Sequence, residues 1–103
     1  MHGQKIYTID EIKALLNPIF KANDVIKSIL FGSYARGEAT AESDVDLITY
    51  VKDSMSIFKF AEMSGDVEDI LDKKIDFLYG GDEFSKSMQE SIEKTGVLLF
   101  EKV

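Results

Sequence analysis

The chain has 103 residues, of which 45% are apolar and 30% are charged, and this composition predicts one globular domain over residues 1–103. Its 12 basic and 19 acidic residues give a formal charge of −7, which argues against direct nucleic-acid binding because that binding depends on Lys and Arg. The lack of cysteine excludes disulfides and thiol chemistry. No apolar run reaches the roughly 18–20 residues that span a membrane, and no signal peptide is recognisable, so a cytoplasmic location is expected.

The first expected element is an amphipathic helix over residues 8–22. Thr8 and Glu11 fit a capping box, in which each side chain satisfies a free backbone amide at the helix start. Apolar residues then recur at helical spacing, namely Ile12, Leu15, Leu16, Ile19 and Phe20. Pro18 lies inside this pattern and is expected to kink or divide the helix.

The rest of the chain alternates between strands and helices. The expected elements are, in order, a strand at 25–31, a short helix at 33–37, a strand at 44–51, a helix capped by Ser54 or Ser56 and ending near 71, a strand at 75–79, a helix capped by Asp82 and ending near 94, and a final apolar segment at 97–100. This α-β-α-β-α-β-α order predicts an α/β (α+β) fold around a small, mostly buried sheet. The second strand has apolar residues on both faces and is expected to be central.

Two aspartates mark the start of the second strand. Gly32 and Ser33 come directly after the first strand. A gap of ten residues separates Ser33 from Asp44, and Asp46 follows two positions later. Because side chains at positions i and i+2 of a strand point to the same side, the two carboxylates are expected to project together. Such charges repel unless a cation lies between them. Mg²⁺ suits this site, since it typically takes one or two carboxylates, waters and substrate phosphates.

A phosphate cradle and a third carboxylate are expected beside this pair. Gly32 lets the backbone approach a ligand closely, and a helix beginning at Ser33 directs free amides and a hydroxyl toward an anion. Asp76 lies in an otherwise apolar strand, where an unpaired charge is costly. It faces the same cluster if the second and third strands pair; alternatively it pairs with Lys73 or Lys74. Three carboxylates, a phosphate cradle and Mg²⁺ are typical of a two-metal nucleotidyl-transfer site.

The segment from Leu30 to Leu47 closely resembles the signature of the minimal nucleotidyltransferase (MNT) family, part of the DNA polymerase beta-like nucleotidyltransferase superfamily. Its Gly-Ser pair, ten-residue gap and Asp-x-Asp agree with the family's GSx10DxD pattern. The resemblance extends more loosely through residues 74–77 and 96–100. It implies the superfamily's fold, with a small mixed sheet and flanking helices.

The resemblance also implies roles for individual residues. By position, Asp44 and Asp46 are ligands of a two-metal Mg²⁺ site, and Asp76 is the third carboxylate, serving as ligand or general base. Gly32 and Ser33 bind the phosphates of the substrate ATP.

Arg36, in the same signature, has two alternative roles. It either contacts the triphosphate or pairs with Glu38 or Glu42. The chain has Ala41 where many relatives have proline, a difference that affects loop stiffness more than chemistry.

Small stand-alone members of this family are commonly antitoxins, encoded with a HEPN-domain RNase toxin, and transfer AMP from ATP to a tyrosine of that toxin. The resemblance therefore implies a Mg²⁺-dependent protein adenylyltransferase whose partner is such a toxin. The chain is expected to form one domain, without a second domain to shape a site for a small acceptor, which favours a protein acceptor. Two alternatives stay open: an antitoxin that acts by docking alone, and nucleotidyl transfer to a small molecule.

Overall fold

A computed structural model describes residues 5–102 and contains four helices and four strands in that range. Their order is α1 (Ile9–Ala22), β1 (Val25–Phe31), α2 (Gly32–Ala35), β2 (Val45–Val51), α3 (Ile57–Leu71), β3 (Ile75–Tyr79), α4 (Lys86–Thr95) and β4 (Val97–Glu101). The strands form one sheet in the order β3-β2-β1-β4. β1 is antiparallel to β2 and β4, whereas β2 and β3 are parallel, so the expected mixed sheet is confirmed, as is the central position of β2.

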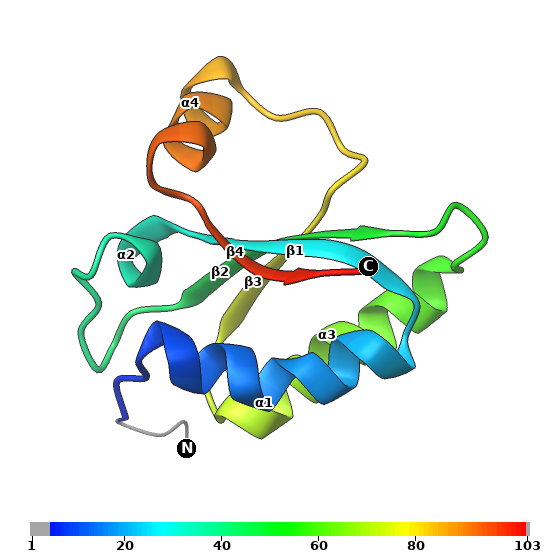
Figure 1. The fold of residues 1–103 in the computed structure, drawn as a ribbon, viewed down its shortest axis with the longest axis horizontal. Helices are drawn as coiled ribbons and strands as arrows, with labels where there is room; N and C mark the ends of the chain where they lie inside the picture. The colour runs from blue at the N-terminus through cyan, green and yellow to red at the C-terminus, as the bar shows by residue number, and fades with distance from the viewer. Residues whose placement is uncertain (1–4, 103) are drawn as a thin grey trace.

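The helices divide between the two faces of this sheet. α1 and α3 contact each other and cover one face, while α4 lies on the opposite side and contacts α2 and β1 (Figure 1). The short helix α2 lies at the end of the sheet where β1 stops and β2 starts. The loops that flank α2 therefore meet the beginning of β2 at one end of the molecule.

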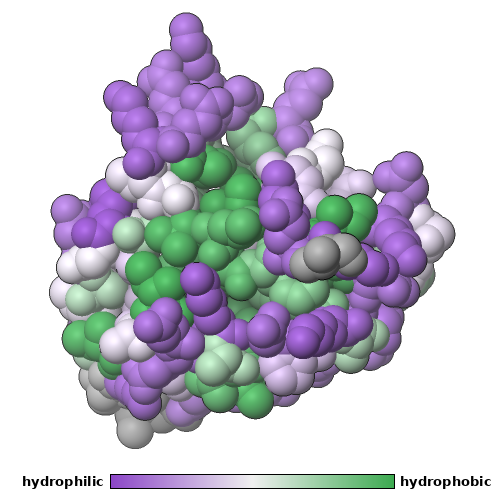
Figure 2. Space-filling view, viewed as in Figure 1, coloured by the Kyte–Doolittle hydropathy of each residue, from purple (hydrophilic) through white to green (hydrophobic). Residues whose placement is uncertain are grey.

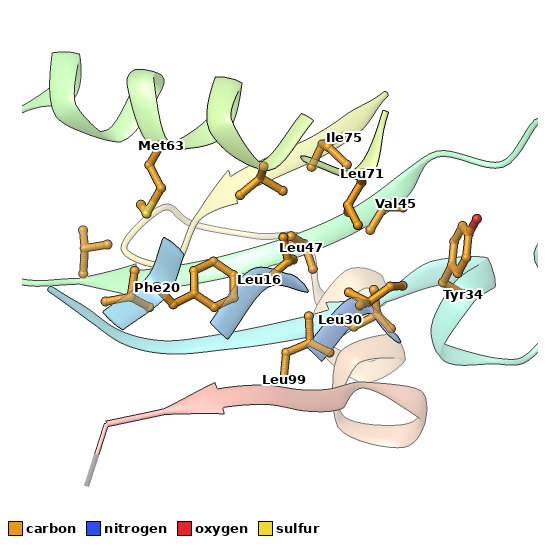
Figure 3. Close-up of a cluster of buried hydrophobic side chains, with 14 residues drawn as sticks. Leu16, Phe20, Leu30, Tyr34, Val45, Leu47, Met63, Leu71, Ile75 and Leu99 are labelled. Atoms are coloured by element: carbon orange, nitrogen blue, oxygen red, sulfur yellow. The ribbon is translucent and has the colours of Figure 1, made fainter. Parts of the chain in front are cut away.

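The core lies between the α1–α3 layer and the sheet. Side chains from both helices and from the inward face of the strands point toward one another there (Figure 3). The members that are completely or almost completely buried are Ile12, Leu16, Phe20, Val25, Leu30, Val45, Leu47, Met63, Val67 and Leu71. Two buried hydroxyls, of Ser28 on β1 and Thr49 on β2, satisfy each other through a 3.0 Å hydrogen bond.

The N-terminal helix is continuous through its proline. The capping box of Thr8 and Glu11 is present, but Pro18 lies inside a single 14-residue helix and does not divide it. Because Pro18 has no N–H, the carbonyl of Ala14 has no donor within the helix. Both residues lie on the exposed side of α1. Water can satisfy that carbonyl, so the helix tolerates the proline.

The last part of the chain differs from expectation in two places. Residues 97–100, expected only as an apolar segment, belong to the edge strand β4, because they pair with the open edge of β1. The last helix is capped by Ser85 and not by Asp82, whose amide instead bonds to the Tyr79 carbonyl in a turn after β3. The α3 cap is Ser56, one of the two candidates.

The β4 side of the molecule has an apolar middle and a hydrophilic rim (Figure 2). Leu98 of this edge strand is 45% exposed. Within residues 5–102, no helix is long and apolar enough to cross a membrane.

Candidate active site

Strand pairing brings Asp46 and Asp76 together. They are register partners on the parallel strands β2 and β3, and Asp44 immediately precedes β2. On β2, Asp46 alternates with Val45 and Leu47, which are buried in the core beneath α1 and α3. Because strand side chains alternate between faces, Asp46 and its partner Asp76 project from the opposite face of the sheet. The pairing of the second and third strands, which the sequence left as a condition, is present.

The electrostatics of Asp46 show that negative charge accumulates here. Partial burial of its carboxyl group, followed by repulsion from Asp76 and then from Asp44, raises its pKa to about 6, while Arg36 acts in the opposite direction. Asp44 and Asp76 are more exposed than Asp46. A carboxyl whose pKa is raised by two neighbouring carboxylates is a group that a bound cation would favour in its charged form.

The glycine turn lies directly against this carboxylate. Gly32 follows Phe31, which is the β1 partner of Asp46, and has a positive φ of +74°. A Cβ atom placed on Gly32 would overlap Oδ2 of Asp46. Glycine is therefore required both by the backbone conformation and by the close approach. Ser33, half-buried, follows it in the first turn of α2.

Arg36 is paired within its own loop. Its Nε donates to Oε1 of Glu38 at 2.9 Å, and its side chain is 40% exposed. Of the two acidic partners expected for Arg36, the structure pairs it with Glu38. Arg36 nevertheless lies close enough to Asp46 to lower the pKa of that carboxyl group. It therefore borders the carboxylate cluster, and its contact with a triphosphate stays a prediction.

The two lysines before β3 do not neutralise Asp76. No ion pair of Asp76 is found within residues 5–102; Lys74 is exposed, and Lys73 is buried and donates to the carbonyl oxygen of Ala41 at 2.9 Å. Sequence reasoning missed this contact of Lys73. The local sequence carries no signal for this contact, because Ala41 lies 32 residues earlier in the chain.

The donor atoms fit a hard cation, although the site is not a complete protein cage. Asp44, Asp46 and Asp76 offer carboxylate oxygens, which Mg²⁺ prefers over nitrogen and sulfur. Among residues 5–102, no group of three or more His, Cys, Asp or Glu side chains is arranged to hold a metal ion. Mg²⁺ usually keeps waters and takes substrate phosphates as ligands, so a site completed by the substrate is consistent with this arrangement.

A protein-family model matches most of the chain. Residues 14–103 match the family model described as Polymerase beta, Nucleotidyltransferase. The matched range contains the glycine turn and all three aspartates. The chain therefore belongs to this nucleotidyltransferase family.

Two relatives resemble most of the chain. "Putative protein adenylyltransferase MJ0128" of Methanocaldococcus jannaschii is 36% identical over 91 residues, covering 84% of this chain and 93% of the relative. "Protein adenylyltransferase MntA" of Thermococcus cleftensis is 30% identical over 92 residues, covering 85% of this chain and 88% of the relative.

Solved structures share the fold. A toxin–antitoxin crystal structure with AMP-PNP matches with a TM-score of 0.72 and 20% identity, over 87% of this chain and 73% of that one. The structure of a tri-AMPylated HEPN toxin in complex with an MNT antitoxin, from Shewanella oneidensis, matches with a TM-score of 0.66 and 17% identity, over 91% and 73%. The fold is that of a minimal nucleotidyltransferase.

Proposed function

We propose that this chain is a Mg²⁺-dependent protein adenylyltransferase that serves as the antitoxin of a HEPN-domain RNase toxin, transferring AMP from ATP to a tyrosine of that toxin. The observation that carries the proposal is the placement of Asp46 opposite Asp76, with Asp44 alongside and Gly32 in contact with Asp46. The names of the two relatives support a protein acceptor. The AMPylated HEPN toxin bound to a neighbour of the same fold supports this kind of partner.

The three carboxylates have distinct tasks in this proposal. Asp44 and Asp46 would hold the divalent ion, and Asp76 would complete the ligand set or accept the proton of the attacking hydroxyl. Mg²⁺, when bound, neutralises the triphosphate and stabilises the departing pyrophosphate. Gly32 would let the backbone approach the phosphates, and the Ser33 hydroxyl would donate to a phosphate oxygen.

The proposed reaction is the displacement of pyrophosphate from ATP by a tyrosine hydroxyl. The tyrosine oxygen forms a bond to the α-phosphorus of ATP, and the bond from that phosphorus to the bridging oxygen of the β-phosphate breaks. The electron pair leaves with pyrophosphate, and the phenolic proton passes to a carboxylate, for which Asp76 is the candidate. Asp44 and Asp76 are exposed, so a side chain presented by another protein can reach them.

The test is to incubate the purified chain with ATP, Mg²⁺ and the toxin encoded beside it, and then to measure the intact mass of the toxin. We expect the toxin to gain one or more adenylyl groups, and peptide sequencing to place them on tyrosine. An unmodified toxin from a pair that forms a complex would contradict the proposal.

A docking antitoxin is the second candidate, and one surface feature favours it. Ile57 and Phe58, at the start of α3, are 78% and 83% exposed, as is common for residues that contact another protein. Replacing Asp44 and Asp46 by Ala separates the two candidates. If the folded double variant still neutralises the toxin fully, docking is sufficient.

Supplying labelled ATP with small-molecule acceptors in place of the toxin tests transfer to a small molecule.

A further inference from the structure

Lys73 is a charged residue inside the fold. It is 3% exposed and lies between α3 and β3, directly after Asp72, whose left-handed conformation (φ 51°) ends the helix. Removing an ammonium group from water is costly unless it is hydrogen-bonded. The position immediately after it, Lys74, points outward and is exposed. The chain therefore keeps one of two adjacent lysines inside.

The partner of Lys73 belongs to the loop that carries the nucleotidyltransferase signature. Its Nζ donates to the carbonyl oxygen of Ala41, 32 residues earlier in the chain. This loop has internal bonds between Thr40 and Ser43, from the Thr40 amide to Ser43 Oγ (2.8 Å) and from the Ser43 amide to the Thr40 carbonyl (3.1 Å). Those bonds shape the turn but do not attach it to the body of the protein. Ala39 packs against the core at the start of the loop, and the Lys73 hydrogen bond attaches the loop further along, at Ala41.

The attachment lies close to the proposed metal ligands. Ala41 precedes Asp44 by three residues, and the amide of Val45 bonds to the Lys74 carbonyl at 3.1 Å. The segment of Lys73 and Lys74 thus holds the chain on both sides of Asp44. The contact of Lys73 in this loop is with a backbone carbonyl oxygen, and it forms no ion pair within residues 5–102. Lys73 therefore acts through the loop backbone.

We propose that Lys73 is a positioning residue, which fixes the loop before β2 so that Asp44 is held beside Asp46 for binding of the divalent ion. This inference rests on the proposed nucleotidyl transfer at the same carboxylates. A methionine at this position fills nearly the same volume but has no donor, so it leaves the Ala41 carbonyl without its partner. The loop then moves more freely, and the metal site loses the fixed position of one ligand.

The matched variants are Lys73→Met and Lys74→Met. We expect Lys73→Met to raise the Mg²⁺ concentration for half-maximal adenylyl transfer about tenfold. Losses of this size are common when a residue that orients a metal ligand is replaced. High Mg²⁺ should restore most of the rate. Lys74→Met should have the Mg²⁺ dependence of the wild type. Lys73→Arg should have a dependence between those of the wild type and Lys73→Met, because arginine keeps a charged donor. If Lys73→Met and Lys74→Met have the same Mg²⁺ dependence, the inference is wrong.

Two measurements do not require catalysis. Binding of Mn²⁺ with ATP, followed by electron paramagnetic resonance, should weaken in Lys73→Met and not in Lys74→Met. Hydrogen exchange of residues 38–44 should become faster in Lys73→Met alone, and equal exchange in the two variants would overturn the inference. An inactive wild type that still shows both differences would refute the proposed function and leave the role of Lys73 supported.

The wild-type protein offers a test if Lys73→Met does not fold. In ¹⁵N NMR spectra, the Lys73 ammonium should give a signal whose hydrogens exchange more slowly than those of the other lysines. An ammonium that exchanges as fast as that of Lys74 would overturn the inference.

Discussion

Gly32 lies against the carboxylate of Asp46, so closely that a side chain on the glycine would occupy the place of Oδ2. The contact joins the two halves of the signature, which are separated by a loop in the sequence. A phosphate bound at the glycine turn would therefore lie next to Asp46, whose pKa is raised by partial burial and by its acidic neighbours. This relationship gives the first prediction.

Replacing Gly32 by Ala should lower the rate of adenylyl transfer at least a hundredfold. The new methyl group must displace the Asp46 carboxylate. Gly37→Ala is the matched control, because Gly37 has nearly the same φ (+73° against +74°) and nothing within 4 Å of its Cβ position. Both variants should lose about 1 kcal/mol of unfolding free energy from the backbone conformation. Equal activity in the two variants would show that the contact with Asp46 has no catalytic importance.

The raised pKa of Asp46 predicts how stability depends on pH. Its pKa is about 6 in the folded protein against 3.8 for an ordinary aspartate, so the folded state binds the proton more tightly. Between these two values the unfolded state binds fewer protons, and stability therefore falls as the pH rises from about 4 to about 6 and is then level. Because the group is partly solvated, we expect a contribution of about 1–2 kcal/mol.

Urea unfolding in EDTA across this pH range measures the effect. In Asp46→Asn the part of the slope that comes from this residue should disappear, and the variant should be more stable than the wild type above about pH 6. Added Mg²⁺ should stabilise the wild type most at the same high pH, where the carboxylate is ionised. If the stabilities of the wild type and of Asp46→Asn change by the same amount between pH 4 and pH 6, the assignment to Asp46 is contradicted.

Asp76→Asn tests the third carboxylate. We expect a loss of adenylyl transfer of about a hundredfold or more, because a ligand or proton acceptor is removed. The pKa of Asp46 should also fall, since the largest repulsion on it comes from Asp76. Carboxyl NMR shifts of Asp46, recorded through a pH titration, measure this directly. Asp82→Asn removes an exposed carboxylate from the turn after β3 and should change neither quantity.

The hydroxyl pair of Ser28 and Thr49 allows a prediction on the core. Each hydroxyl is fully buried and the two bond to each other, so removing one leaves the other without a partner. Ser28→Ala and Thr49→Val alone should each lower the unfolding free energy by about 1–3 kcal/mol. The double variant should lose clearly less than the sum of the two, because no unpaired hydroxyl remains. Additive losses would indicate that the bond contributes little.

The sequence was sufficient to predict the helices and strands whose apolar spacing repeats, and the central position of β2 in the sheet. The shared direction of Asp44 and Asp46 followed from strand geometry, whereas that of Asp76 depended on whether the second and third strands pair. Local chemistry limited the rest. Asp82 and Ser85 both suit a helix cap, and only the turn formed by Asp82 with Tyr79 decides between them.

Contacts between distant segments were the main omission. The pairing of β4 depends on the free edge of β1, and the burial of Lys73 depends on the carbonyl of Ala41, 32 residues away. Neither partner is marked by a local pattern. The contact of Gly32 with Asp46 lies between these cases, because the motif placed both residues at the site but did not show that they touch.

Calorimetric titration of the purified chain with ATP, with Mg²⁺ and then with EDTA, tests the central claim most directly. The wild type should bind ATP with Mg²⁺ present and lose at least tenfold in affinity when the ion is removed, whereas Asp44→Asn/Asp46→Asn should bind weakly in both conditions. If the wild type binds ATP equally well with EDTA, or if the double variant keeps the Mg²⁺-dependent affinity, then these carboxylates do not hold a metal-bound nucleotide.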